Sequence, residues 1–317
     1  MQIIYCKQCG HILNSNGTDK KGRKRWRCRS CGKSFSASHP KMSQTNWRKR
    51  YEKYLLDKTT LHELAGELKI DDSTLRRQFD KFENISYKPE TIDITGKPLI
   101  IDGLFNCGQV TLIAIGSPQE VYNWDFVDRE NTANWSRLLS SLQGIPLGIV
   151  GDGQKGMFKA VQQIFPGVPL QRCQSHVIGY ICTRLGKKPQ EFAQKYLRAL
   201  AKYISSVRNF KACFRWFHFF DIWKRNYESL ALEKISYINQ NGRKCWRFRY
   251  THLHEAYAHL KAALPYLFNY LFFPELPNTT NDLEGGINSP IRELLRAHRG
   301  AKLDTQKQII SLFLRSK

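Results

Sequence analysis

The chain has 317 residues and a formal net charge of +23, with 50 lysines and arginines against 27 aspartates and glutamates. A hydrophobic content of 41% excludes wholesale disorder, and no segment approaches the roughly 18 uninterrupted apolar residues that a membrane span needs. Nine cysteines, in a chain whose first residues lack the pattern of a secretory signal, predict reduced thiols, and the positive charge favours nucleic acid over a membrane surface as the partner.

Two pairs of cysteines stand out in the first 50 residues, which also hold 13 of the lysines and arginines but a single acid. Cys6 and Cys9 form one CxxC pair, Cys28 and Cys31 form a second, and 18 residues separate the two pairs. Two such turns can complete a closed tetrahedral zinc site. A segment of about 40 residues buries too little apolar surface to fold alone, so the metal would supply folding energy. We predict that residues 1–40 form a zinc ribbon with one structural Zn²⁺.

A basic segment connects the two cysteine pairs and runs from Lys20 to Arg27, with Trp26 as its one aromatic residue. Lys24 and Arg25 lie near its centre, where the single acid of this region cannot neutralise the charge. We predict a strand or hairpin in which Lys24 and Arg25 contact DNA phosphates. A solvated charged face without a ligand is the alternative.

Residues 60–82 have the spacing of a helix-turn-helix. Apolar residues recur at helical intervals up to Leu68, residues 69–72 form the turn, and Asp72 or Ser73 caps a second helix. That helix would enter the major groove, although an amphipathic pair of helices that merely packs is the alternative. We therefore predict a helix-turn-helix DNA-binding region over residues 41–90. Its candidate DNA contacts are Ser73, Thr74, Arg76, Arg77 and Gln78.

From residue 98 the sequence changes to an α/β pattern. Three strands are predicted between residues 99 and 127, and the first of them carries Asp102 in its middle. A helix follows, and then a buried strand that ends at Asp152, between two glycines. Further helix and strand segments continue to residue 185. Three antiparallel strands, a helix and then strand–helix units form the order of an RNase H-like fold.

Asp102 and Asp152 are the first candidate site residues. An aspartate in the middle of an apolar strand costs several kcal/mol unless its charge is compensated, and α/β domains place functional residues at the carboxyl ends of strands. Two hard oxygen donors on neighbouring strands suit Mg²⁺ or Mn²⁺. For each aspartate taken alone, a cap or turn role is the alternative. Together they predict a divalent metal site.

The chain resembles insertion-sequence transposases of the Mutator-like DDE superfamily, in their zinc-binding variant. The resemblance extends over essentially the whole chain and depends on short motifs spread along it. These motifs are Ile100-Ile101-Asp102-Gly103-Leu104, Gly151-Asp152-Gly153, Arg172-Cys173-Gln174-Ser175-His176, Asn278-Thr279-Thr280-Asn281-Asp282-Leu283-Glu284-Gly285 and Arg296-Ala297-His298-Arg299-Gly300.

The resemblance implies that Glu284 joins Asp102 and Asp152 in an acidic triad that is both catalytic and metal-binding. From the residues alone, Glu130 and Glu293 rival Glu284 as the third acid. Thr279 or Thr280 can cap the helix that carries Glu284. The two glycines after it, costly in an ordinary helix, indicate close approach of another backbone or of DNA.

Cys173 and His176 lie just past the strand that follows Asp152, at a spacing that the superfamily commonly has near its active site. The resemblance implies a structural or DNA-positioning role for the pair. Ordinary core residues are one alternative, and direct action of His176 on the scissile phosphate is another.

The resemblance also implies the domain organisation. An α/β RNase H-like core spans residues 91–185 and is completed by residues 278–317, which carry Glu284. Residues 186–277 form an all-helical insertion. The zinc ribbon and the helix-turn-helix precede this core.

The implied function is that of a DDE transposase. It would bind the terminal inverted repeats of its own mobile element and use Mg²⁺ or Mn²⁺ for DNA cleavage and strand transfer. Its partners would be the double-stranded DNA of element ends and target, and pairing two ends requires a homodimer or higher oligomer. We expect a bacterial, cytoplasmic protein associated with DNA. The alternatives are a DNA-binding regulator with a non-cutting RNase H-like domain and a metal-dependent structure-specific nuclease.

Overall fold

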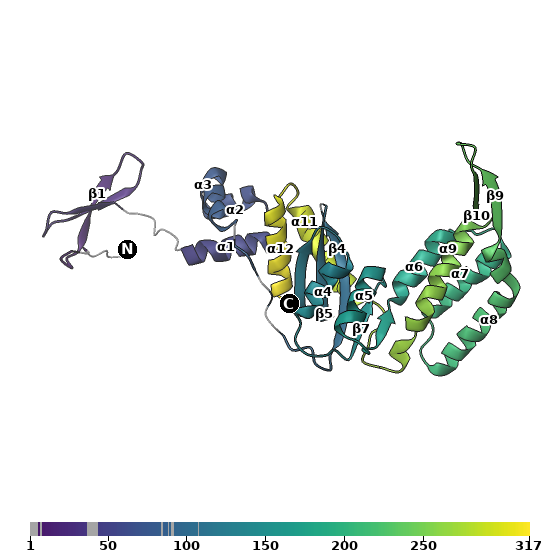
Figure 1. The fold of residues 1–317 in the computed structure, drawn as a ribbon. Coiled ribbons are helices and arrows are strands. Elements are labelled where there is room, and N and C mark those ends of the chain that lie inside the picture. The colour runs from purple at the N-terminus through teal and green to yellow at the C-terminus, as the bar shows by residue number, and fades with distance from the viewer. Residues whose placement is uncertain are drawn as a thin grey trace.

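The computed structural model describes residues 6, 8–36, 44–83, 85–87, 89, 92–106 and 108–317. Along the chain come a small N-terminal sheet, a group of short helices, a five-stranded sheet covered by helices, and a mostly helical subdomain (Figure 1). Among the described residues, no helix has the length and apolarity of a membrane span.

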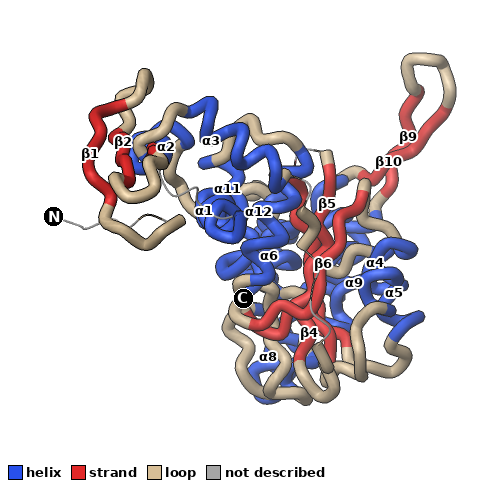
Figure 2. The backbone as a smooth tube through the Cα atoms, turned by 90° about the vertical axis from the view of Figure 1, so that its left-hand side faces the viewer, coloured by secondary structure: helices blue, strands red, loops and turns tan. Residues whose placement is uncertain are grey.

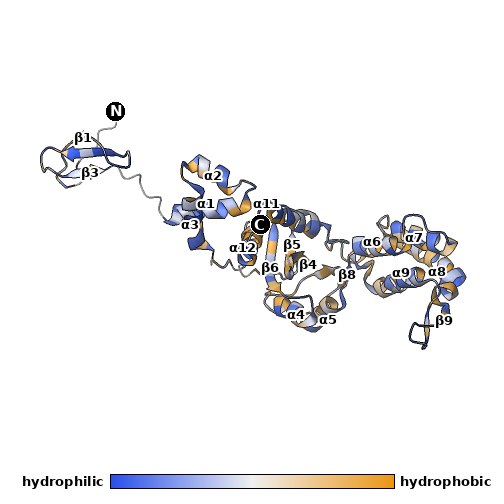
Figure 3. Cartoon of the chain, turned by 90° about the horizontal axis from the view of Figure 1, so that it is seen from above, coloured by the Kyte–Doolittle hydropathy of each residue, from blue (hydrophilic) through white to orange (hydrophobic). Residues whose placement is uncertain are grey.

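The N-terminal sheet is antiparallel, in the order β1-β2-β3. Among the described residues, its buried core consists of Cys6, Leu13 and Cys28, and the ribbon of this sheet is coloured mostly as hydrophilic residues (Figure 3). So small a core cannot offset the conformational entropy of the segment. The predicted hairpin between the cysteine pairs is confirmed. The strands are β1 (Leu13–Thr18), β2 (Lys24–Cys28) and β3 (Ser34–Ser36).

Three helices follow the N-terminal sheet and share one apolar core with the C-terminal helix α12 (Leu303–Arg315). Thr60 and Glu63 form a capping box at the start of α2. Asp71, and not Asp72 or Ser73, caps α3, because its carboxylate accepts the Thr74 N–H at 2.8 Å. The helices are α1 (Gln44–Leu56), α2 (Leu61–Leu68) and α3 (Asp72–Phe79), with a 3₁₀ turn over Asp80–Phe82.

The five-stranded sheet is mixed, in the order β6-β5-β4-β7-β8. The first three strands pair in antiparallel fashion, whereas β7 and β8 run parallel to β4. The predicted α/β organisation is thereby confirmed, and its assignment to the RNase H-like class stays a prediction. The strands are β4 (Pro98–Asn106), β5 (Gln109–Ser117), β6 (Glu120–Val127), β7 (Gly148–Gly151) and β8 (Leu170–Arg172).

Helices cover both faces of this sheet. Leu99 and Ile101 of β4 pack on one face with α4 and α5, whereas Ile100 and Leu104 pack on the other with the C-terminal segment. Because side chains alternate along a strand, Asp102 belongs to the face of the C-terminal segment. The elements are α4 (Thr132–Ser140), α5 (Lys155–Ile164), α10 (Asn281–Leu283), a π-helical stretch (Glu284–Asn288), α11 (Ser289–Ala297) and α12 (Leu303–Arg315).

The helical subdomain has its own core, in which Trp216 and Trp223 are fully buried and donate their indole N–H groups to the carbonyls of Leu200 and Ala193. Helix α6, which we placed in the sheet domain, packs into this core. The elements are α6 (Gln174–Leu185), α7 (Phe192–Ile204), α8 (Phe210–Leu232), β9 (Lys234–Ile238), β10 (Lys244–Phe248), α9 (Thr251–Ala263) and 3₁₀ turns over Leu264–Tyr266 and Asn269–Leu271.

The insertion is not all-helical, contrary to our prediction. Strands β9 and β10 form an antiparallel hairpin between α8 and α9. A turn with Gly242 at φ +71° joins them, and such a glycine favours a reversal of the chain over a continuing helix. Two short strands between long helices carry too weak a periodicity to be recognised from sequence.

Candidate active site

Asp102 and Asp152 lie beside one another at the edge of the sheet where β7 ends. Ile100 of β4 pairs with Val150 of β7 in parallel register, so two residues further along each strand Asp102 stands opposite Asp152. Asp102 is buried and accepts a hydrogen bond from Asn288 Nδ2 at 3.1 Å. Burial, and then repulsion from Asp152, raises the pKa of Asp102 to about 6.

Asp152 is held in place by its own loop. Its Oδ1 accepts the backbone N–H of Gln154 at 2.8 Å, and Gly153 has φ +83°, a conformation that favours glycine. The guanidinium of Arg172 occupies the space that a Cβ at Gly153 would need, and its Nη1 donates to the Gly153 carbonyl at 3.1 Å. The Arg172 guanidinium therefore packs directly against the turn that carries Asp152.

Glu284 reaches the same edge from the C-terminal part of the chain. It follows α10 directly and begins the π-helical stretch, and its charge adds to the raised pKa of Asp102. Gly286 packs against Pro118, whose Cβ would lie 2.5 Å from a Cβ at that position. The two glycines therefore differ, because Gly286 is approached closely by the Pro118 ring, and not first by a backbone as predicted, whereas Gly285 faces open space.

Cys173 and His176 hold the segment that carries Glu284. The backbone N–H and the hydroxyl of Thr280 both donate to Cys173 Sγ at 3.3 Å, and His176 Nε2 lies 3.2 Å from Glu284 Oε1. Thr280 stands at the start of α10 but makes no side-chain cap bond, because its hydroxyl is bound to Cys173. Of the two predicted caps, it is Thr279 whose hydroxyl oxygen accepts the Asn281 N–H, at 3.4 Å. The pair therefore connects the end of β8 to the Glu284 carboxylate.

The contacts among Cys173, His176 and the nearby carboxylates also shift the pKa values of Cys173 and His176. Burial alone would raise the pKa of the Cys173 thiol, but the polar interactions with His176 and Thr280 outweigh burial and lower it. The polar interaction with Cys173, helped by Asp102 and Glu284, raises the pKa of His176 to about 9. His176 Nδ1 has no hydrogen-bond partner among the described residues, so the polar contact that this ring makes at hydrogen-bond distance is the one between Nε2 and Glu284.

Of the two rival glutamates, one lies at this site and the other does not. The carboxylate of Glu130 fills the space beside Gly103, and burial, followed by repulsion from Asp152 and Asp102, raises the pKa of Glu130 to about 7. Glu293 is exposed and forms an ion pair with Lys58 at 2.9 Å. Sequence reasoning considered Glu130 only as a substitute for Glu284, whereas the structure brings both to the aspartates.

The carboxylate group is more widely spaced than the cysteine group. In the described part of the chain, only the four cysteines form a set of three or more candidate ligands whose ligand atoms all lie within 4.8 Å. The carboxylates are nevertheless close enough to raise the pKa of Asp102 and of Glu130. Crowded carboxylates with raised pKa values are a donor set suited to a hard divalent cation, which would relieve their repulsion.

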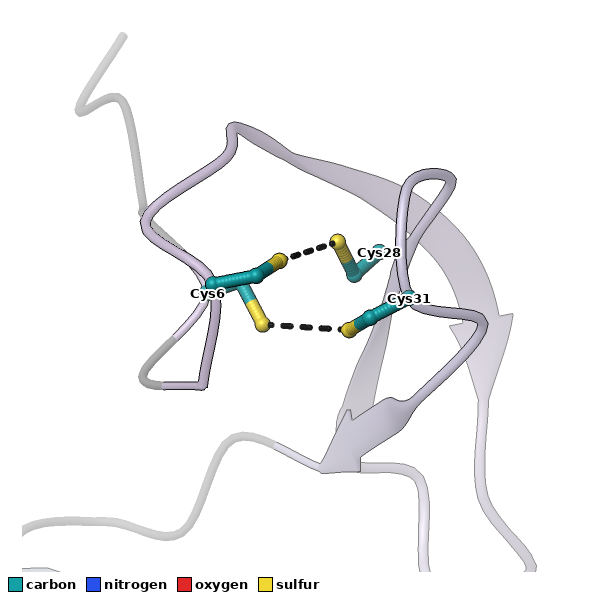
Figure 4. A group of neighbouring side chains, drawn as sticks. Cys6, Cys28 and Cys31 are labelled. Carbon is teal, nitrogen blue, oxygen red and sulfur yellow. Dashed lines mark hydrogen bonds between the residues drawn. The ribbon is translucent and has the colours of Figure 1, made fainter.

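The four cysteines form the predicted group (Figure 4). Cys6 and Cys31 have their sulfurs 3.6 Å apart, and Cys9 and Cys28 have theirs 3.4 Å apart, near the roughly 3.8 Å edge of a tetrahedron with 2.3 Å metal–sulfur bonds. Hydrogen bonds from backbone N–H groups, first that of Cys31, lower the pKa of the Cys28 thiol to about 7. This cluster could hold a structural metal such as zinc.

The candidate DNA contacts lie on two separate elements. Lys24 and Arg25 are exposed on β2, and Arg76 and Arg77 are exposed on α3. The hydroxyls of Ser73 and Thr74 instead donate to the carboxylate of Asp71, at 2.5 and 2.9 Å. These two side chains complete the cap of α3, so among the α3 candidates the arginines are the better placed to contact DNA.

Residues 105–239 match the family model described as "Transposase, Mutator family", a segment that includes Asp152, Cys173 and His176 but neither Asp102 nor Glu284. No curated protein matches the chain. Over the matched segment, the chain is similar to transposases of the Mutator family.

Proposed function

We propose that the protein is a DDE transposase that binds the terminal inverted repeats of its own element and catalyses metal-dependent DNA cleavage and strand transfer. The observation that carries the proposal is the meeting of Asp102, Asp152 and Glu284 at one sheet edge. The strand order of the sheet supports an RNase H-like core. Asp102 and Glu284, which lie outside the matched segment, would complete the site around Asp152.

We propose that Asp102, Asp152 and Glu284 hold Mg²⁺ or Mn²⁺. Bound divalent cations would lower the pKa of an attacking water and stabilise the leaving oxygen. The protein's own part is to position ligands, since the Asn288 amide orients Asp102 and the Gln154 N–H orients Asp152.

The reaction then runs in two displacements at one site. Water attacks the phosphodiester at the element end, the P–O3′ bond breaks, and the element keeps a free 3′-OH. That 3′-OH attacks a target phosphodiester, a new P–O bond forms, and the target 3′ oxygen leaves. Neither step needs a covalent protein intermediate.

We propose one structural Zn²⁺ on Cys6, Cys9, Cys28 and Cys31, and we propose that the ribbon and α3 bind the element ends. The exposed cations of β2 and α3 support this role. Pairing two ends requires a homodimer or higher oligomer.

A strand-transfer assay tests the proposed function. Labelled duplexes with the inverted repeats that flank the gene are incubated with the protein, Mg²⁺ and a target plasmid. We expect nicking at the repeat terminus and joining to the plasmid. Binding without nicking would instead indicate a regulator, and nicking governed by DNA structure without joining would indicate a nuclease.

We expect Cys173→Ala to reduce cleavage by about 10- to 100-fold while leaving affinity for DNA ends unchanged. The change leaves two buried Thr280 donors unpaired and frees the Glu284 segment, and losses of this size are typical when the support of a metal ligand is removed. Cys182→Ala, a half-buried cysteine on the same helix, is the control. Equal effects of both variants on cleavage would contradict the positioning role.

We expect Lys24→Ala with Arg25→Ala to weaken binding to terminal and random DNA alike. Each lost phosphate contact makes the negative slope of log affinity against log salt concentration less steep by about 0.9.

Arg76→Ala or Arg77→Ala should reduce the binding free energy by roughly 1–3 kcal/mol on the terminal sequence, and by less on random DNA, if that arginine contacts a base edge. Titrations of both DNAs at several salt concentrations measure this. Equal losses on both DNAs would make the α3 arginines phosphate contacts.

A further inference from the structure

The β9–β10 hairpin is the one strand element of the helical subdomain, and the proposed chemistry does not use it. It extends away from the helices that carry it (Figures 1 and 2), and nearly all its residues are exposed or half-buried. Trp246 is 58% exposed and Ile238 is 74% exposed. A two-stranded hairpin is marginally stable by itself in water, and large exposed apolar side chains favour a binding partner.

The hairpin is strongly basic. Residues 234–249 contain five lysines and arginines and no acid. Arg249 pairs with Glu233, the residue before the hairpin, at 2.8 Å. Among the described residues, the other four bases of this segment have no carboxylate partner. These are Lys234, Arg243, Lys244 and Arg247.

Aromatic rings support these cations from both faces of the hairpin. Lys234 Nζ lies 4.1 Å from the ring centroid of Trp246, and the Arg247 guanidinium lies 5.5 Å from that of Tyr237. Cations held over rings keep their charge at the surface while covering apolar area. Surfaces on which basic side chains alternate with aromatic side chains are typical of proteins that bind nucleic acid.

The hairpin also repeats the sequence of the N-terminal ribbon. Gly-Arg-Lys-x-Trp-Arg occurs at residues 22–27 and again at residues 242–247. In both copies the tryptophan pairs across the ladder with a serine, Ser15 in the ribbon and Ser236 in the insertion.

The two copies share their turn as well. Asp19 Oδ1 accepts two backbone N–H groups at 2.9 Å, and the equivalent Asn239 Oδ1 accepts two at 3.0 and 2.9 Å. Gly22 and Gly242 then take φ +72° and +71°. Two segments of similar sequence therefore form similar basic hairpins in this chain. The first lies beside the cysteine cluster, and the second lies in the helical subdomain.

We propose that the β9–β10 hairpin is a second DNA-binding ribbon, which contacts the backbone of double-stranded DNA through Lys244 and Arg247. The inference rests on the proposed function, in which the chain acts on DNA. A two-stranded ribbon fits the major groove, and a polyanion matches the charge, whereas a second copy of this +23 chain would repel it. The hairpin and α1–α3 lie on opposite sides of the five-stranded sheet (Figures 1 and 3), so it would hold DNA that those helices do not reach.

The test compares Lys244→Gln/Arg247→Gln with a control, Lys211→Gln/Arg215→Gln. The control removes two exposed charges from the first turns of α8, about 25 Å or more along that helix from the hairpin. Full-length proteins are titrated with terminal and random duplexes between 50 and 200 mM salt, and circular dichroism and sedimentation report folding and association.

We expect the hairpin variant to bind both duplexes more weakly. Its log affinity should also fall less steeply with log salt concentration, by about 2 in slope. Its affinity gap to the wild type should narrow about tenfold between 50 and 200 mM salt, with unchanged melting and association, while the control should stay near the wild type. The inference would be overturned if the hairpin variant kept the wild-type affinity for DNA and the wild-type salt dependence. It would also be overturned if the variant lost self-association while its DNA binding stayed unchanged. A wild-type protein that binds DNA but does not cut would contradict the proposed function and leave this comparison valid.

Discussion

Asp102→Asn, Asp152→Asn and Glu284→Gln should each abolish cleavage and strand transfer at element ends. Each change removes a ligand charge but almost no volume, and removing a catalytic group commonly costs on the order of 10⁴-fold in rate. Affinity for the ends should stay largely intact, because the proposed DNA contacts lie on other elements. Labelled-end nicking and plasmid joining in Mg²⁺ measure the loss.

Stability supplies a readout that does not depend on activity. The folded-state pKa of Asp102, about 6, lies above the ordinary value, so near neutral pH the ionised side chain opposes folding. Asp102→Asn removes that charge, so without divalent cations its melting temperature should equal or exceed that of the wild type. The increase in melting temperature on adding Mn²⁺ should shrink.

Glu293→Gln is the matched control for these variants. It makes the same kind of change at an exposed glutamate paired with Lys58, and it should cut like the wild type. An Asp102→Asn protein that nicked ends at nearly the wild-type rate would show that the triad assignment is wrong.

Purified protein should carry about one tightly bound Zn²⁺ per chain, and Cys28→Ser should lose the metal together with specific binding to element ends. The buried core of the N-terminal sheet is too small to fold without the metal. The sheet domain and the helical subdomain should keep their thermal transitions, because their cores are separate from it.

Elemental analysis, melting curves and end-binding titrations of the two proteins measure this. Cys182→Ser, on α6 and outside the cysteine cluster, should keep both zinc and end binding. A protein free of zinc that still bound its ends normally would remove the case for a structural metal.

Local spacing was enough for several features. Two CxxC pairs define a four-sulfur group because each pair lies on one tight turn, and the structure brings all four sulfurs together. Asp102 and Asp152 were recognisable because each interrupts or ends an apolar strand, and adjacent parallel strands place such residues at one edge. Alternation and helical periodicity also predicted most strands and helices of the sheet domain.

The sequence by itself therefore determined the cysteine cluster, the paired aspartates and the α/β pattern, since each depends on neighbours along the chain. Only the tertiary structure decided which glutamates reach the aspartates, because Glu284 arrives on the C-terminal segment through contacts with Cys173 and His176 more than a hundred residues earlier. It also decided that Thr280 bonds to Cys173 instead of capping its helix. No local pattern encodes these contacts, because they form only when the two segments pack against the same edge of the sheet.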